Sequence, residues 1–259
     1  MSTTKSQASA DNDQLLPAPP ELLQAVDQLK AYSLRYEVAM KLVLDKLDYI
    51  SREYELRYGY ALIDSKQSRI KSPESIVGKM QRKHLPLTLN AVFNNLHDIA
   101  GIRLIVRFLS DVKTVEDLLA TQADIKVLRV KDYIHHPKAN GYQSLHLILG
   151  VPVYTVDGPS IVEVELQVRT IAMNFWASLE HELNYKKNVP HQADLRASLT
   201  KKAQLITELD QEMDEIKRRM YQPKTPPKEV WKIPSHFVEK WLGIFFVHLT
   251  AVKVVRCGD

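Results

Sequence analysis

The sequence predicts an α+β fold, in which a β-sheet is flanked by helices and long helices stand near both ends. Residues 162–170 alternate apolar and polar side chains at the strand period of two. Residues 103–108 and 144–149 repeat this alternation. Two longer segments, 22–54 and 194–220, instead carry apolar residues at three- and four-residue steps, which is the helical period.

Composition excludes several classes of protein. The chain has 259 residues, 45% hydrophobic and 25% charged, which is typical of a soluble globular protein of one large or two small domains. A net charge of +4 is too small to indicate a nucleic-acid binder. Cys257 is the single cysteine, so neither a disulfide framework nor a thiolate metal site is expected. Residues 1–13 lack the apolar core of a signal peptide, and we expect a cytoplasmic protein.

The chain divides into three parts. Residues 1–20 are small and polar and end in prolines, so we interpret them as a disordered arm. Residues 21–220 form the domain. Residues 221–259 are a proline-rich linker and a tail of unassigned role. The apolar run 241–247 is shorter than the ~20 residues that span a bilayer, so no membrane partner is expected.

The polar face of segment 162–170 is the strongest functional signal. Glu163, Glu165, Gln167 and Arg169 share one face, while valines and a leucine share the other. A solvated sheet face is the ordinary explanation of such a row. However, segments 103–108 and 144–149 also place arginine or histidine on one face. Three such strands favour a site over a solvated surface.

A basic segment upstream is a candidate phosphate site. Ser72-Pro73-Glu74 has the features of a helix start, and Arg69 and Lys71 stand just before it. Lys79, Arg82 and Lys83 continue the positive charge along the helix. A solvated basic helix is the alternative explanation. The sequence contains neither the Gly-x-x-x-x-Gly-Lys-Ser/Thr loop nor the Gly-x-Gly-x-x-Gly motif, so side chains must hold the phosphates of any bound nucleotide.

Turn residues and helix-capping residues predict where the remaining strands and helices begin and end. Asn140-Gly141 predicts a tight hairpin turn with both residues at positive φ, and Asp157-Gly158 predicts a second turn. Asp111 is expected to cap a short helix that ends near Thr121, and a strand is expected over 125–133.

Two helices follow the last strand. Residues 170–187 are predicted to be helical, with Ile171, Phe175, Trp176, Leu179 and Leu183 on one side. In segment 194–220 an apolar stripe repeats at coiled-coil-like spacing, through Leu195, Leu199, Ile206, Leu209, Met213, Ile216 and Met220. Such a stripe needs a partner, which is either its own domain or another subunit.

Four motifs carry a family resemblance. They are Asp-Ile-Ala-Gly-Ile-Arg at 98–103, Lys-Ala-Asn-Gly-Tyr-Gln-Ser-Leu-His at 138–146, Glu-Leu-Gln-Val-Arg-Thr at 165–170 and Phe-Trp-Ala-Ser-Leu-Glu-His at 175–181. Together, and in this order, they resemble the synthetase domain of the RelA/SpoT family, and most closely its single-domain branch, the small alarmone synthetases. The resemblance covers roughly residues 32–220.

The resemblance implies a nucleotidyltransferase-like mixed sheet and a specific reaction. The family transfers the β,γ-pyrophosphate of ATP to the 3′-hydroxyl of GDP or GTP, forming ppGpp or pppGpp and AMP. Asp98 and Glu165 match the acidic pair that holds Mg²⁺, a hard cation that prefers oxygen ligands. Glu165 would also help to take the proton of the attacking hydroxyl. Glu163 is a supporting candidate on the same face.

The same family resemblance implies the nucleotide-binding residues. Arg69 and Arg103 match arginines that sandwich adenine, and Lys71, Ser75 and Lys79 match residues that hold the ATP phosphates. The GDP or GTP side is expected to comprise Tyr142, which matches the ring that stacks on guanine, with His146, Gln167 and Asn174.

Family resemblance further implies a homo-oligomer, namely a tetramer, with single-stranded RNA and (p)ppGpp as candidate regulators. Two alternatives stay open: a toxin that pyrophosphorylates the 3′ end of tRNA, and a catalytically quiet RNA- or nucleotide-binding regulator. Long family members also carry a hydrolase domain with a His-Asp motif. Here the dipeptide His97-Asp98 belongs to the synthetase motif, so we expect the product to be degraded elsewhere.

Overall fold

The computed structural model describes residues 20–185 and 192–221 of the chain. Apart from Pro20 and Tyr221, the predicted arm, linker and tail lie outside the described residues. None of the described helices is long and apolar enough to cross a membrane.

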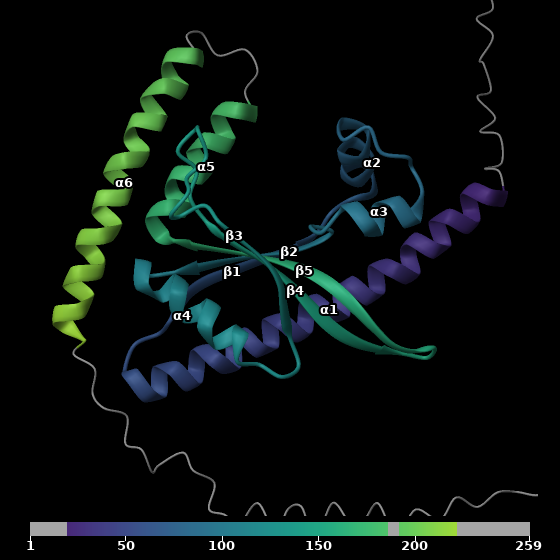
Figure 1. Ribbon diagram of the computed structural model, residues 1–259, viewed down its shortest axis with the longest axis horizontal. Coiled ribbons are helices and arrows are strands. Elements are labelled where there is room, and N and C mark those ends of the chain that lie inside the picture. Colours follow the sequence, from purple (N-terminus) through teal and green to yellow (C-terminus); the bar gives the residue numbers. More distant parts are fainter. Residues whose placement is uncertain (1–19, 186–191, 222–259) are drawn as a thin grey trace, which may run out of the picture.

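A five-stranded mixed sheet forms the centre of the fold (Figure 1). The strand order is β1-β2-β5-β4-β3, in which β2 and β5 are parallel and every other neighbouring pair is antiparallel. The strands are β1 (Ile63–Ile70), β2 (Ala100–Val106), β3 (Lys126–Asp132), β4 (Leu145–Thr155) and β5 (Gly158–Thr170).

Helices flank this sheet, as the sequence predicted. They are α1 (Pro20–Tyr58), α2 (Pro73–Arg82), α3 (Leu89–Asn95), α4 (Leu109–Ala120), α5 (Ile171–Tyr185) and α6 (Gln192–Met220). The long α1 runs diagonally across the sheet, while α2 and α3 lie toward one side and α5 and α6 toward the other (Figure 1).

One face of the sheet forms the core, and the predicted alternation is confirmed there. Leu104, Leu147 and Leu166 are fully buried, and they pack in one cluster with residues of α1 and α4, such as Val43 and Val115. Burial of such side chains contributes about 1.5–3 kcal/mol each. Because successive strand residues point to opposite faces, this packing directs the polar rows to the other face.

Two local predictions need correction. Strand β1 was expected only as an extended approach to α2, because Ile-Asp-Ser-Lys-Gln-Ser-Arg-Ile has no clean alternation. It is an edge strand that is hydrogen-bonded only to β2, and its sequence therefore lacks the apolar alternation by which a strand is predicted. The α4 helix begins at Leu109, before Asp111. Asp111 still caps it, since its Oδ2 accepts a hydrogen bond from the backbone N–H of Phe108 at 3.2 Å.

The predicted tight turn at Asn140-Gly141 forms, because the Gly141 N–H donates to the Lys138 carbonyl at 2.8 Å and the Lys138 N–H donates to the Tyr142 carbonyl at 3.2 Å. It does not join two strands directly, however, and this part of the prediction is wrong. Twelve residues separate β3 from β4, and only Gly141 of this pair has positive φ, at +89°. Gly141 lies against α6, where an added Cβ would stand 2.5 Å from the Cβ of Ala203. The glycine therefore serves a close approach of loop and helix. The turn at Asp157-Gly158 does join β4 to β5, with Gly158 at φ +112°.

The described part of the domain covers little of the apolar stripes of α5 and α6. In α5, Trp176 is buried, but Phe175 is 60% exposed because Met173 and Ala177 face inward instead. In α6, Leu209, Met213 and most of the remaining stripe face solvent. The residues that α6 buries include Ala203, Asp210, Asp214 and Lys217, so a polar stripe packs on the domain.

Candidate active site

A cavity of about 240 Å³ opens on the polar face of the sheet. Among the site residues predicted from the sequence, those that line it are Arg69, Asp98, Arg103, Glu165 and Gln167. They come from β1, β2, β5 and the segment just before β2. The strand alternation and the sheet order thus bring together residues that are up to 98 positions apart, from Arg69 to Gln167 (167 − 69).

Strand register explains this convergence. Gly101 of β2 lies between Arg69 of β1 and Glu165 of β5, and Arg103 is paired with Gln167. Because Gly101 has no side chain, the floor of the cavity stays open between the arginine and the carboxylate. Arg103 also contacts Gln67 of β1 at 3.5 Å, through its Nη1 and the amide Oε1.

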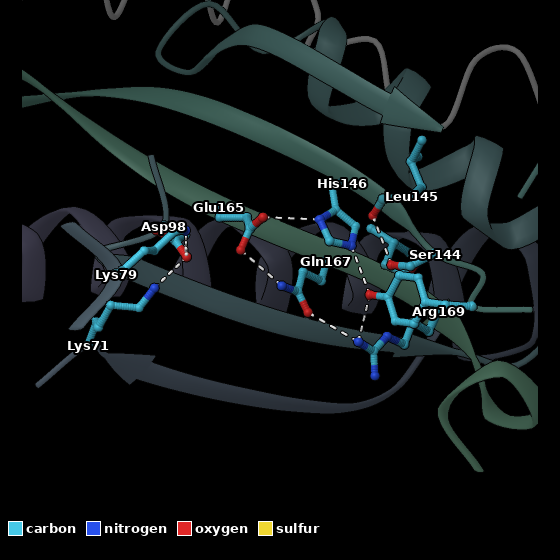
Figure 2. A network of polar contacts seen from close by, with 11 residues as sticks. Lys71, Lys79, Asp98, Ser144, Leu145, His146, Glu165, Gln167 and Arg169 are labelled. Carbon is cyan, nitrogen blue, oxygen red and sulfur yellow. Dashed lines mark hydrogen bonds and ion pairs between the residues drawn. The ribbon is translucent and has the colours of Figure 1, made fainter. Parts of the chain in front are cut away.

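Asp98 is held by two lysines at one end of this wall. Lys71 Nζ and Lys79 Nζ both contact its Oδ2, the latter at 2.6 Å, and Figure 2 shows the pair converging on one oxygen. Burial alone would raise the pKa of Asp98, but the two lysines hold it below its ordinary value. Its other oxygen, Oδ1, is buried and has no hydrogen-bond partner among the described residues.

Glu165 lies at the centre of the polar row. His146 Nδ1 is 3.0 Å from its Oε1, and Gln167 Nε2 donates to its Oε2 at 2.9 Å. Burial opposes the ionised form of Glu165, but these two partners outweigh it, so its pKa lies below the ordinary value. The negative charge of Asp98 acts in the opposite direction, which shows that the two carboxylates are electrostatic neighbours.

A continuous hydrogen-bonded chain links Glu165 to the acceptor side (Figure 2). Arg169 Nη2 donates to the hydroxyl of Tyr142 at 2.8 Å, and that hydroxyl is 2.9 Å from His146 Nε2. With Glu165 ionised and the imidazole neutral, every link has one donor and one acceptor: the Tyr142 O–H donates to Nε2, and the Nδ1–H donates to Glu165. This series of hydrogen bonds therefore orients the Tyr142 side chain relative to the Glu165 carboxylate.

Tyr142 belongs to a cluster of rings and cations beside this row. Its ring centroid is 6.0 Å from that of His146 and 6.1 Å from that of Tyr133. Lys138 Nζ lies 4.7 Å from the Tyr142 centroid, and Arg169 Cζ lies 5.1 Å from it. The tyrosine thus lies on the polar face, as predicted, and it directly follows a tight turn that lies within the long loop between β3 and β4.

The cavity is lined by two arginines, Arg69 and Arg103, and by two carboxylates, Asp98 and Glu165. Burial lowers the pKa of Arg103, and the neighbouring charges of Arg169 and Arg69 lower it further. The Nε atoms of Arg103 and Arg169 are buried without a hydrogen-bond partner among the described residues. Repulsion between cations in one wall is relieved by an anionic ligand, and flat guanidinium groups also stack on aromatic bases.

Three further candidate residues do not line the cavity. Ser75 is in the first turn of α2, where its backbone N–H donates to the Ser72 hydroxyl at 3.3 Å. Asn174 lies in the first turn of α5, and its Oδ1 is 3.4 Å from Arg169 Nη1. Glu163 is on the same strand face as Glu165 but does not line the cavity; its Oε2 lies 2.6 Å from His97 Nδ1, so it supports the segment that carries Asp98.

Sequence reasoning did not select Arg169 or Gln67 as site residues. Arg169 stands on the same face as Glu165 and Gln167, so the strand period already contained the signal. Its contact with Tyr142 was hidden because that contact depends on the path of the 133–144 loop. Gln67 could not be found, because β1 was not predicted as a strand.

Comparisons with known proteins agree with this geometry. Residues 68–190 match the model of the region found in RelA/SpoT proteins. GTP pyrophosphokinase YwaC of Bacillus subtilis is 40% identical over 200 residues, which cover 77% of this chain and 95% of that protein. The chain belongs to the RelA/SpoT family. GTP pyrophosphokinase YjbM of the same organism is 37% identical, covering 73% of this chain and 89% of that protein.

Solved structures of RelA/SpoT relatives share the fold. Small alarmone synthetase 1 of B. subtilis bound to its product pppGpp superimposes with a TM-score of 0.68 at 34% identity, over 75% of this chain and 98% of that one. The same enzyme bound to AMPCPP gives a TM-score of 0.61 at 34% identity, over 74% of this chain and 97% of that one. The predicted mixed sheet with flanking helices is therefore confirmed.

Proposed function

We propose that this chain synthesises (p)ppGpp by transferring the β,γ-pyrophosphate of ATP to the 3′-hydroxyl of GDP or GTP. The observation that carries the proposal is the single polar wall that joins Asp98, with its two lysines, to Glu165 and Tyr142. A pyrophosphate transfer needs a cationic phosphate site, an ionised carboxylate and a place for a second base, in this order. The likeness to synthetases bound to pppGpp and to AMPCPP supports the same assignment.

On the donor side, Arg69 and Arg103 would stack on adenine from the neighbouring strands β1 and β2. Lys71 and Lys79 would hold the phosphates with Ser75, since Lys71 and Ser75 lie at the start of α2 and Lys79 follows Ser75 by four residues along the same helix. Their contacts with Asp98 show that both ammonium groups reach one point beside the cavity. Phosphate oxygens would compete with Asp98 for these lysines, which leaves the carboxylate available for a cation.

On the acceptor side, Tyr142 would stack on guanine, with His146, Gln167 and Asn174 around it. The 3′-hydroxyl oxygen attacks the β-phosphorus of ATP as the bond from that phosphorus to the α,β-bridging oxygen breaks, and AMP leaves. Glu165 receives the hydroxyl proton, because its pKa is held low by partners and it is ionised at neutral pH. His146 and Gln167 fix its two oxygens for this task.

The acidic pair fits a Mg²⁺ ion that is shared with substrate. Asp98 Oδ1 is a buried oxygen without a hydrogen-bond partner among the described residues, and its negative charge is felt at Glu165. The described residues contain no group of three or more His, Cys, Asp or Glu side chains that could hold a metal alone. Magnesium is commonly held by one or two carboxylates plus phosphates and water, and it would neutralise charge on the transferred group.

We further propose a cytoplasmic homo-oligomer, expected to be a tetramer. The support is the solvent-exposed apolar row on α6, in which Leu209, Met213 and Ile216 are each between 42% and 45% exposed. Exposed apolar rows of this kind mark interaction surfaces. Single-stranded RNA and (p)ppGpp remain candidate regulators.

The test is incubation of the purified protein with ATP, Mg²⁺ and either GDP or GTP, followed by separation of the nucleotides. We expect AMP and the 3′-pyrophosphorylated guanosine nucleotide in equal amounts. Glu165→Gln keeps the size of the side chain but removes its charge and basicity, and turnover should fall about 10²- to 10⁴-fold. Glu212→Gln, an exposed change of the same type on α6, is the matched control.

A parallel reaction with deacylated tRNA as acceptor separates the proposal from the alternatives. Label transferred to tRNA, with none on GDP or GTP, would assign the toxin activity instead. Nucleotide binding without any transfer in either reaction would assign a quiet regulator. A Glu165→Gln rate within about threefold of the wild-type rate, in contrast to the expected range, would remove that residue from catalysis.

A further inference from the structure

Helix α6 meets the domain through a polar stripe that repeats every three or four residues. Its members are Thr200, Ala203, Thr207, Asp210, Asp214 and Lys217. Asp210 and Asp214 are 4% and 2% exposed. Burying carboxylates is unfavourable unless they gain specific partners, so an apolar stripe would attach the helix more simply. The polar contacts of α6 are therefore expected to hold specific parts of the domain in place.

The N-terminal half of the stripe holds the loop that carries Tyr142. The Thr200 hydroxyl donates to the backbone carbonyl of Asn140 at 3.2 Å, and the Thr207 hydroxyl donates to Gln143 Oε1 at 3.0 Å. Between these contacts, Gly141 lies directly against Ala203. The residues on both sides of Tyr142 are thus fixed by one helix.

Asp210 holds the other side of the acceptor region. The Thr170 hydroxyl donates to Asp210 Oδ2 at 2.6 Å, and both residues are buried. The same hydroxyl oxygen accepts the backbone N–H of Met173 at 3.0 Å, which caps the start of α5. Thr170 directly follows Arg169, which contacts both the Tyr142 hydroxyl and Asn174.

We propose that Asp210 is a positioning residue for the guanosine acceptor. By fixing Thr170, it sets the direction of Arg169 and the start of α5, and through Arg169 it sets the position of the Tyr142 ring. This inference rests on the proposed function, because it assumes that Tyr142 receives the acceptor base. The donor residues Arg69, Lys71 and Lys79 belong to β1, α2 and the segment between them, outside these contacts, so the effect is selective for one substrate.

The decisive variants keep size while changing hydrogen-bonding capacity. Asp210→Leu removes the acceptor of the Thr170 bond, whereas Asp210→Asn keeps an oxygen that can accept it. Thr170→Val removes the hydroxyl from the other partner. Glu212→Leu makes the same chemical change on the exposed face of α6 and serves as the control. The measurements are kcat, the KM for GDP, the KM for ATP and the melting temperature.

We expect Asp210→Leu to raise the KM for GDP by roughly 10- to 100-fold, the scale that misplacement of a binding group produces. The KM for ATP should stay near its wild-type value, and Asp210→Asn should restore the KM for GDP. Thr170→Val should reproduce the defect, and the double variant with Asp210→Leu should add little to it, because both changes break one contact. A merely structural role would alter both KM values and the melting temperature without this selectivity.

Three results would overturn the inference: equal increases in both KM values, an unchanged KM for GDP in Asp210→Leu, or a defect of the same size in Glu212→Leu. If the wild-type protein forms no product, the proposed function fails separately. Titration calorimetry with GDP then decides the positioning role. Weaker GDP binding in Asp210→Leu but not in Asp210→Asn supports it, and equal binding, or no binding by any variant, overturns it.

Discussion

Removing the Tyr142 ring should weaken use of the guanosine nucleotide and leave ATP binding almost unchanged. A base stacked on an aromatic side chain contributes ~1–3 kcal/mol by alanine substitution in nucleic-acid binders. Taken as the scale for Tyr142→Ala, this range corresponds to a loss of roughly 5- to 150-fold in affinity for GDP or GTP. Adenine would be held by Arg69 on β1 and Arg103 on β2, so the affinity for ATP should not change.

Tyr142→Phe separates the ring from its hydroxyl. It keeps the stacking surface but removes the group that joins Arg169 to His146. We expect a smaller loss in acceptor affinity and a larger loss in kcat, because His146 then loses the partner that orients it toward Glu165. Acceptor and donor affinities are measured by calorimetry on variants whose melting temperature matches the wild type. Equal losses for both nucleotides, or no loss for the acceptor in Tyr142→Ala, would refute the assignment.

Three further predictions concern the metal, the pH dependence and the assembly. Asp98→Asn should raise the Mg²⁺ concentration that gives half-maximal rate, because it removes the charge of a carboxylate whose buried Oδ1 has no hydrogen-bond partner among the described residues; an unchanged Mg²⁺ titration would argue against a metal role. Burial, opposed by Thr170 and assisted by the charge of Asp214, raises the pKa of Asp210 from 3.8 to about 6. Between about pH 4 and pH 6 the folded protein therefore keeps the Asp210 proton, whereas the unfolded chain releases it. The free energy of unfolding consequently falls as the pH rises from about 4 to 6. Asp210→Asn should become more stable relative to wild type across that window, by up to roughly 3 kcal/mol, as measured by denaturant unfolding at pH 4 and pH 7. Replacing Leu209 and Met213 together by Glu should give a smaller particle in light scattering without lowering the helix content; an unchanged mass would exclude this face from the interface.

Much of the fold and the centre of the site could be predicted because they follow from strand periodicity. Glu165 and Gln167 lie on one face of β5, and His146 lies on the same face of β4, since the opposite faces carry the core. Once the strands are adjacent, this alternation alone brings the three side chains into hydrogen-bonding distance. The apolar row of α1, with Val43 and Leu47, was likewise readable from its helical period.

The remainder depends on contacts between segments that have no local signal. Strand β1 is a polar edge strand, so the place of Arg69 beside the cavity came only from the family motif. The link from Arg169 to Tyr142 depends on a twelve-residue loop, whose path is set by packing on α6 as well as by the turn at residues 138–142. Asn140 adopts no positive φ, because this turn places only Gly141 in the left-handed region.

The two stripes of α6 show why hydrophobic periodicity identified the helix but not its orientation. The period of Leu209, Met213 and Ile216 correctly predicted a helix, yet the domain binds the stripe displaced by one position, which contains Asp210, Asp214 and Lys217. Asp214 accepts a hydrogen bond from the backbone N–H of Ser110 at 2.8 Å, and Lys217 is paired with Asp111 at 2.5 Å. These partners on α4 make burial of the charges tolerable. An amphipathic helix can therefore present its polar side to its own fold when that side has specific partners, and its apolar side is then left for another surface. In this chain the polar side also contacts the acceptor loop, so a change in α6 would reach Tyr142 through Thr207 and Asp210 before it reached the donor residues.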